Sequence, residues 1–341
     1  MPIFMDRHDV SEEVTAENVA QLHQADLKIQ DQYNCKGLTY WFDDVRKTAF
    51  CLIEAPNKES LTKMHNDAHG EVPHRIIEVD PAIVESFLGR IEDPKKSQKT
   101  ELNIINDPAF RTLVVFRNEF PDNEELLSLT TKLDGRMVSN NLISFTSVTK
   151  AVEFSVSLLE RFTQSSTSFG IGVSSGIPVS EKKEIFEDTI TLSHRLSEFG
   201  INEILISSEV FDLFMSENKN QFPYKNQTRV IKQSEEKFLT ELMDFVEHNW
   251  QNTELQVEDF NDKLGYSKSK FYRVLKSLTG KSANTFLKDY RLAKAMIALK
   301  TTDQSVSEIA YNSGFSSPSY FSKCFQKKYD SLPSSYQRAK Y

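Results

Sequence analysis

The stretch SVSEIAYNSGFSSPSYFSKCFQKKY, residues 305–329, decides how the last third of the chain folds. A short helical pattern ends near Gly314, and a second helical pattern follows it at once. Glycine accepts the left-handed backbone that turns a chain sharply between two helices. Phe321, Cys324 and Phe325 share one helical face, which predicts that this face is buried. The second helix is then expected to expose Ser317, Pro318, Ser319, Ser322, Lys323 and Lys327.

The same arrangement occurs earlier, in VEDFNDKLGYSKSKFYRVLKSLTG, residues 257–280. A short helix is predicted to end at Gly265, and Ser267 is predicted to cap a second helix. The spacing predicts that this second helix buries Phe271, Val274, Leu275 and Leu278 and exposes Lys268, Ser269, Tyr272, Arg273 and Lys276. Residues 283–303 are long enough for a helix that connects the two pairs. A helix with polar and cationic residues on its exposed face can enter a DNA major groove. An ordinary helical bundle with solvated charges is the plainer alternative.

Charge is unevenly distributed along the 341 residues, whose net charge is −8. From Glu254 to the end there are 15 Lys and Arg residues against 8 Asp and Glu residues, a net charge of +7. Residues 1–253 therefore carry a net charge of −15. This asymmetry indicates that the C-terminal segment meets a polyanion.

The C-terminal segment resembles the AraC/XylS family of transcription regulators in YRLAKAMIAL (290–299), in residues 305–329 and in LPSSYQ (332–337). The resemblance covers about the last hundred residues. It implies that one chain binds two adjacent major-groove segments of double-stranded DNA in a sequence-specific way. Asp330 stands where the family usually has glycine. Because Asp tolerates a left-handed backbone better than most residues, the turn is expected to survive.

Residues 1–80 alternate between strand and helix patterns. We predict strands at 2–8, 37–44, 48–56 and 74–80 and helices at 15–33 and 58–70. This β-α-β-β-α-β order is the ferredoxin-like arrangement.

The segment KMHNDAHGEVPH, residues 63–74, places His65 and His69 four residues apart on one helical face, where both could bind a metal ion. It lacks the general base of a metalloprotease, because Asn66 follows the first histidine. On spacing alone, two solvated surface histidines are the plainer interpretation.

The segments DRHDV, LHQADL, LTYWFD, AFCLIEAP and HNDAHG…IIEV, within residues 4–79, resemble a family of ferredoxin-like bacterial nickel-binding proteins. That resemblance implies a divalent transition metal, nickel first, held by His8, His23, His65 and His69. His74 does not match the family pattern. Imidazole nitrogen with Asp oxygen suits nickel, zinc, copper or cobalt. A small organic effector without a metal is the alternative.

The middle of the chain alternates strand and helix patterns from Phe110 onward, and RMVSNNLISF, residues 136–145, is predicted as one strand. The polar stretch 220–233 is predicted as a second domain boundary. Residues 169–178 and 186–214 resemble the second half of class III nucleotide cyclase homology domains. Those enzymes need two Asp residues for their metal ions, but the first position falls near Asn118 and the glycine-rich loop has shortened to VSNNLISF. Arg195 matches a transition-state arginine, whereas Thr191 replaces its asparagine partner. We expect a cyclase-like fold without catalysis that dimerises or binds a small ligand; a structural spacer is the plainer alternative.

The expected fold class is therefore multidomain α+β, with a ferredoxin-like domain, a cyclase-like α/β domain and an all-α double helix-turn-helix domain. The expected boundaries are 1–82 for the metal-binding sensor domain, 83–108 for a linker, 109–216 for the cyclase-like domain and 235–341 for the DNA-binding domain. The protein is expected to be a cytoplasmic homodimer and not an enzyme. It is also expected not to be membrane-bound, because no apolar run in the sequence could span a bilayer. Its three cysteines are expected to be reduced, buried thiols: Cys35, Cys51 and Cys324. A nucleotide cyclase or a metal-dependent enzyme fused to a DNA-binding domain is the alternative.

Overall fold

The structure is a computed structural model that describes residues 1–94, 102–105, 107–117, 120, 122–163, 169–200 and 202–338. The chain divides into two compact units, Met1–Ile231 and Lys232–Tyr341. None of the helices in the described ranges has the length and apolar run that a membrane crossing requires.

The first unit begins with a four-stranded antiparallel sheet in the strand order β2-β3-β1-β4. Its elements are β1 (Ile3–Asp9), α1 (Ala16–Ile29), a 3-10 helix (Gln30–Tyr33), β2 (Lys36–Asp43), β3 (Thr48–Glu54), α2 (Lys58–His69) and β4 (Arg75–Val79). This is the predicted β-α-β-β-α-β order. Helix α1 is shorter than the helix predicted over residues 15–33, because the chain tightens into a 3-10 helix after Ile29.

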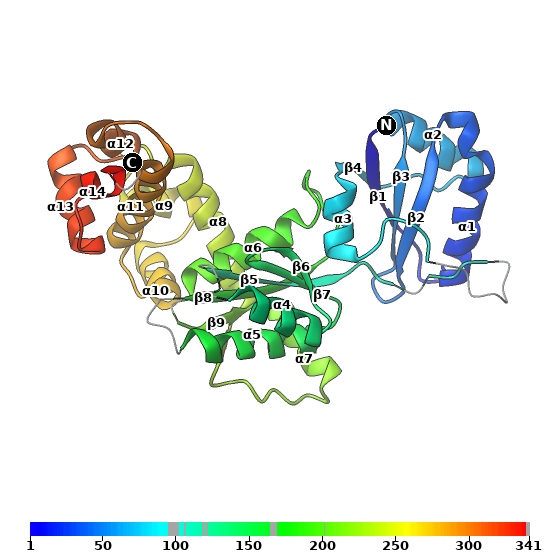
Figure 1. Ribbon diagram of the computed structural model, residues 1–341, viewed down its shortest axis with the longest axis horizontal. Coiled ribbons are helices and arrows are strands. Elements are labelled where there is room, and N and C mark those ends of the chain that lie inside the picture. The colour runs from blue at the N-terminus through cyan, green and yellow to red at the C-terminus, as the bar shows by residue number, and fades with distance from the viewer. Residues whose placement is uncertain are drawn as a thin grey trace. The chain divides into compact units, whose positions relative to one another are not determined.

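The two faces of this sheet have different surroundings. Helices α1 and α2 lie on one face (Figure 1), where Phe4 and Tyr40 belong to the core beneath them. Met5 and Trp41 belong to a different core on the other face. Because successive strand residues point to opposite faces, Asp6 points in the same direction as Phe4. Strand β1 therefore places polar side chains under the helices.

The second sheet of this unit has six strands in the order β10-β9-β8-β5-β7-β6. Its elements are β5 (Arg111–Arg117), α4 (Asn123–Lys132), β6 (Arg136–Ser139), β7 (Leu142–Phe145), α5 (Val148–Phe162), β8 (Gly170–Gly176), α6 (Glu187–Phe199), β9 (Ile204–Ile206), α7 (Ser208–Glu217) and β10 (Thr228–Val230). Four of these strands, in the order β8-β5-β7-β6, repeat the antiparallel arrangement of the first sheet. Helices α5 and α6 cover opposite faces (Figure 1).

Two sequence-based expectations for this segment differ from the structure. Residues 136–145, predicted as one strand, form the hairpin of β6 and β7, because the Asn140–Asn141 pair makes a turn. The polar stretch 220–233, predicted as a boundary, contains β10, which pairs in parallel with β9. The position near Asn118 lies outside the described residues.

The segment expected as a linker, 83–108, is structured at its start and packs against both sheets. It overlaps helix α3 (Pro81–Leu88), whose Phe87 carbonyl accepts hydrogen bonds from Arg111 Nε at 3.2 Å and Ser144 Oγ at 3.1 Å. Farther along, the Asp107 carbonyl accepts from the Phe42 amide at 2.9 Å. A single apolar core joins Met5, Trp41 and Phe87 to residues of β5 and β7. The start of the segment expected as a linker is therefore a packed helix, whose Val84, Phe87 and Leu88 are buried in the core that both sheets share.

The second unit contains helices and no strand in its described residues. Its helices are α8 (Gln233–Asn249), α9 (Val257–Leu264), α10 (Lys268–Thr279), α11 (Ala283–Thr301), α12 (Val306–Asn312), α13 (Pro318–Tyr329) and α14 (Pro333–Arg338). Gly265 ends α9 with a φ of 66°, and the Ser267 hydroxyl accepts from the Lys270 amide to cap α10. The helix pairs α9–α10 and α12–α13 are the two predicted helix-turn-helix units, and α11 connects them.

Candidate metal centre and DNA-binding helices

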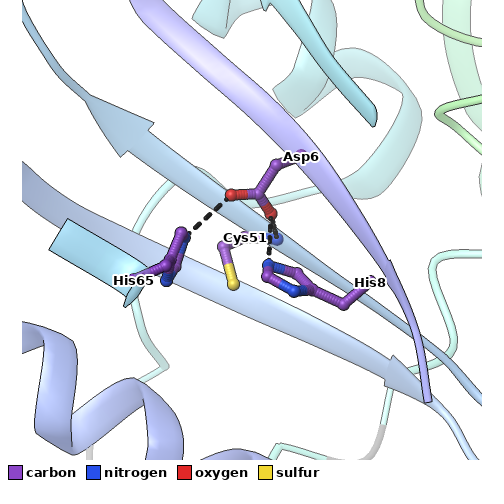
Figure 2. A group of neighbouring side chains, drawn as sticks. All are labelled: Asp6, His8, Cys51 and His65. Carbon is purple, nitrogen blue, oxygen red and sulfur yellow. Dashed lines mark hydrogen bonds and ion pairs between the residues drawn. The ribbon is translucent and has the colours of Figure 1, made fainter. Parts of the chain in front are cut away.

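Four side chains with metal-binding atoms meet between β1, β3 and α2 (Figure 2). Asp6 and His8 are two residues apart on β1 and therefore share a face. Cys51 on β3 is paired with Asp6 in the strand register, and its amide donates to Asp6 Oδ1 at 3.0 Å. His65 reaches the same place from α2, with Nε2 at 3.0 Å from Asp6 Oδ2. The donor atoms of these four residues all lie within 4.8 Å of one another.

His65 lies between two buried carboxylates. Its Nε2 faces Asp6, and its Nδ1 lies 3.1 Å from Asp26 Oδ1 on α1. Burial by itself would lower the pKa of His65, but the hydrogen bonds to Asp26 and Asp6 outweigh burial and raise that pKa to about 10. Burial would raise the pKa of the Asp6 carboxyl, but the charge of His8 and the hydrogen bond to His65 lower it. In the same way, hydrogen bonds to His65 and His69 lower the pKa of Asp26 against the effect of its burial. Without a metal, His65 is an imidazolium ion that bridges two carboxylates.

A second donor group shares His65. It contains Asp26 and His69, with His69 Nε2 at 3.1 Å from Asp26 Oδ1 and at 3.3 Å from His65 Nδ1. On its other side, His69 Nδ1 accepts a hydrogen bond from the Glu71 amide at 3.1 Å. The two groups together form one polar cluster below α1 and α2.

The structure brings together three of the four predicted ligands, His8, His65 and His69. His23 lies apart from them: its Nε2 is 3.4 Å from Asp93, and its ring centroid is 5.0 Å from that of Tyr40. The plainer interpretation of solvated surface histidines is wrong, since His65 is 1% exposed.

Sequence reasoning missed Asp6, Asp26 and Cys51 as candidate donors. The alternation of β1 could have indicated Asp6, because it is two residues before His8. No signal along the chain indicates Cys51, which meets Asp6 only through strand pairing. Burial and the negative charge of Asp6 hold the pKa of the Cys51 thiol well above its usual value.

A cavity of about 210 Å³ adjoins the cluster. Imidazoles and the Cys51 thiol line one part of it, and apolar side chains such as Val14 and Leu22 line another. Two buried nitrogens on its walls, His8 Nε2 and His23 Nε2, have no hydrogen-bond partner among the described residues. Nitrogen, oxygen and sulfur donors this close together suit a divalent transition metal, so the residues present fit the group that the sequence predicts.

In the second unit, α10 exposes all five residues predicted on its outer face: Lys268, Ser269, Tyr272, Arg273 and Lys276. Tyr272 is 55% exposed, and Lys268 forms an ion pair of 2.8 Å with Glu258 of α9. Phe271, Leu275 and Leu278 are buried, whereas Val274 is half-buried.

Helix α13 follows its prediction less closely. Ser319, Lys323 and Lys327 are exposed, but Ser317, Pro318 and Ser322 are half-buried. The reason for the first two is their place at the helix start: the Ser317 hydroxyl accepts from the Tyr320 amide as N-cap, and Pro318 is the first helical residue. Tyr320, missed by the sequence analysis, is 54% exposed.

The turn after α13 confirms the expectation for its unusual residue. Asp330 adopts the left-handed conformation with a φ of 54°, and its amide donates to the Gln326 carbonyl. Of the three cysteines, Cys35 and Cys51 are buried, but Cys324 is only half-buried.

Two family models match this chain. One describes a helix-turn-helix domain and matches residues 261–339. The other describes the nickel responsive protein SCO4226-like family and matches residues 4–79. Neither match reaches the segment between residues 80 and 260.

Three curated relatives each match about a third of the chain or less. Histidine kinase P4 of Formosa agariphila is 38% identical over 107 residues, which cover 31% of this chain and 8% of the relative. The HTH-type transcriptional activator RhaS of Mannheimia succiniciproducens is 32% identical over 93 residues, which cover 27% of this chain and 34% of the relative. The Transposon Tn10 TetD protein of Escherichia coli is 33% identical over 96 residues, which cover 28% of this chain and 69% of the relative. The chain thus spans about a third of RhaS and less of the kinase. The C-terminal domain is therefore an AraC-type helix-turn-helix domain, and residues 4–79 match the nickel responsive protein SCO4226-like family.

Proposed function

We propose that this chain is a sequence-specific DNA-binding transcription regulator of the AraC/XylS type, whose partner is double-stranded DNA. The observation that carries the proposal is the pair of helix-turn-helix units, each of which exposes cations on its second helix. The net charge of +7 from residue 254 onward supports it, because phosphate contacts supply much of the affinity for DNA.

Helices α10 and α13 are proposed to enter two successive major grooves. Arg273 and Lys323 are exposed near the middle of these helices, where a side chain can reach base edges. The other exposed residues of the two faces, Tyr272 among them, would contact bases or phosphates around these two. Ser317 and Pro318 would act mainly by starting α13 at the correct place.

Binding of the full-length protein to a DNA site selected from a random pool tests this proposal. Arg273→Ala and Lys323→Ala should each weaken binding to the selected site by roughly 1–3 kcal/mol, and less on unrelated DNA. Lys237→Ala is a matched control, because Lys237 is an exposed cation on α8, outside both second helices. If all three variants bound the site as tightly as the parent over a range of salt, the assigned helices would be the wrong ones.

We further propose that a divalent transition metal, nickel first, controls DNA binding from residues 1–82. The donors that would hold it lie around His65, and His23 lines the same cavity without belonging to either donor group. When bound, the ion would supply a fixed positive charge between Asp6 and Asp26, in place of the imidazolium proton. A small organic effector in the 210 Å³ cavity is the alternative controller.

Metal control requires that the ion bind more tightly to one arrangement of the protein than to another, and the effect must be reciprocal. Elemental analysis of the purified protein should find a transition metal, and a chelator should change its affinity for DNA. Equal DNA affinity with and without metal would limit the site to metal binding alone. A protein that retains no transition metal would favour the organic effector.

For the fold, we propose that residues 1–82 are a ferredoxin-like domain and residues 109–216 a degenerate cyclase-like domain. The strand orders of the two sheets support the proposal. Arg195, which matches a transition-state arginine by resemblance, is 5% exposed on α6. We propose that this segment holds two chains together as a homodimer. A monomeric mass for the full-length protein at micromolar concentration would count against that role.

A further inference from the structure

Two donor groups compete for the ion of the proposed metal site, and both contain His65. One consists of Asp6, His8, Cys51 and His65 (Figure 2), and the other of Asp26, His65 and His69. The predicted histidine ligands are divided between them. Hydrogen bonds and charge decide which group is available to a metal.

The hydrogen bonds of His69 exclude it as a ligand. Its Nδ1 accepts the Glu71 amide at 3.1 Å, so the lone pair of this nitrogen is occupied. In a neutral ring the other nitrogen then carries the proton, and Nε2 donates to Asp26 at 3.1 Å. No lone pair of His69 is free for an ion.

The contacts of Asp26 fix the orientation of His65. Asp26 Oδ1 lies 3.1 Å from His65 Nδ1, which donates its proton to the carboxylate. Histidines that bind metals usually donate their other nitrogen to such a carboxylate, which holds the ring in place. His65 Nε2 then points to the Asp6 side, where it would bind the ion.

Cys51 completes the group on the Asp6 side. Strand register places it directly opposite Asp6 on the same face of the sheet, and it is 8% exposed. It also lines the cavity together with His8, so an ion in the cavity would reach both side chains. The His8 Nε2 atom, buried without a hydrogen bond, is 3.4 Å from Asp6.

A metal ion binds the thiolate form of cysteine and not the thiol. A divalent ion with one carboxylate, one thiolate and two neutral imidazoles as its direct ligands carries no net charge. Asp26 stays outside this set, where its carboxylate accepts hydrogen bonds from His65 and His69. All four proposed ligands are at least nine-tenths buried.

We propose that Asp6, His8, His65 Nε2 and the thiolate of Cys51 hold the ion, and that Asp26 and His69 orient His65. This inference rests on the metal-binding function proposed above. As the ion binds, the thiol proton of Cys51 and the Nε2 proton of His65 pass to water, and no group changes its oxidation state. A donor set with sulfur and two imidazoles selects ions such as Ni²⁺, Co²⁺ and Zn²⁺ over Mg²⁺ and Ca²⁺.

Absorption spectroscopy of the reduced, metal-stripped, full-length protein tests the thiolate. Titration with Ni²⁺ or Co²⁺ alone should produce a near-ultraviolet band of thiolate-to-metal charge transfer in the parent. Cys51→Ser should lose that band. Cys35→Ser should keep it, and it is a matched control because Cys35 is buried in the same core.

The role of His69 needs a second measurement. His69→Ala should keep one ion and the band, with metal affinity weakened about 10–100-fold, and His69→Gln should recover part of that loss by donating to Asp26. Binding of metal without the band, or a band that survives Cys51→Ser, would overturn this donor set. So would loss of the bound ion in His69→Ala together with normal binding in Cys51→Ser. A parent that binds no ion would refute the proposed metal function itself.

Discussion

Replacement of His65 by alanine should destabilise the metal-free first unit strongly, although a histidine on a helix surface would be lost at little cost. The reason is the position of the imidazolium between Asp6 and Asp26. Asp6 is 0% exposed, and Asp26 is buried as well. Their charges would remain in the core without a cation between them.

Two estimates of the magnitude agree. Removing one partner of a buried charge pair costs roughly 3–5 kcal/mol. A pKa of about 10 in the folded protein, against 6.5 for an ordinary histidine, corresponds to about 5 kcal/mol at roughly 1.4 kcal/mol per tenfold change in proton affinity. Because the pKa is raised, this stabilisation is complete below pH 6.5 and is lost as the pH rises toward 10. The difference in unfolding free energy between parent and variant should therefore fall to roughly 1–2 kcal/mol at pH 9.

Urea unfolding at pH 6 and pH 9, with a chelator present, measures this difference. Trp41 is buried in the first unit, so its fluorescence should change when that unit unfolds. In a Trp250→Phe background, Trp41 is the one tryptophan of the sequence, and the fluorescence signal then comes from the first unit. His74→Ala is the control, because it removes an exposed histidine whose Nδ1 accepts one hydrogen bond from the Asp9 amide. The control should cost less than about 1 kcal/mol.

A His65→Ala protein as stable as the His74→Ala control at pH 6 would refute this reasoning. A second variant separates lost charge from lost packing. Asp6→Asn added to His65→Ala removes one buried charge and keeps an acceptor for the Cys51 amide. It should recover part of the lost stability, whereas no recovery would mean that packing around His65 accounts for the effect.

Metal uptake should rise steadily between pH 6 and 9 and should not level off above the ordinary histidine pKa of 6.5. The reason is that the ion must displace the proton of His65 and that of Cys51. Calorimetry in two buffers should count about two protons released per ion at pH 7.5. Gly314→Ala should destabilise the second unit by roughly 1–3 kcal/mol more than Gly265→Ala. A Cβ at position 314 would lie 2.5 Å from a backbone oxygen, whereas the space at position 265 is open. Equal midpoints of thermal unfolding for the two variants would contradict this. Asp330→Gly should raise the stability of the same unit by about 0.5–1 kcal/mol by relieving a left-handed backbone, which urea unfolding can check. With ATP or GTP and Mg²⁺ or Mn²⁺, the full-length protein should form no cyclic nucleotide, and chromatography of the products would show any turnover.

Local sequence patterns predicted much of the fold. Gly265 ends α9 and Ser267 caps α10 as expected, because both effects act within a few residues of the chain. The left-handed turn at Asp330 is equally local. The helix spacing also identified the buried aromatic residues of α13, Phe321 and Phe325. The outer faces of the second helices could thus be predicted in large part from residue spacing alone.

The sequence pattern did not reveal helix α3 at the start of the expected linker, because the decisive contacts are not local. Its polar residues were visible in the sequence, but α3 is stabilised by contacts with two sheets. A segment of eight residues gains little from helix propensity, so the apolar surface that Phe87 buries determines its structure.

For the metal site, the sequence by itself determined that His65 and His69 share a helical face and that His8 ends a strand. It did not determine which donors meet, because those contacts come from elements that are distant along the chain. Strand register alone places Cys51 opposite Asp6, and a shift of one residue would turn it to the other face of the sheet. The packing of α1 against α2 brings Asp26 to His65, whereas His23 of the same helix lies 3.4 Å from Asp93. The ligands could be anticipated by residue type, but tertiary contacts decided which of them are close enough to bind one ion.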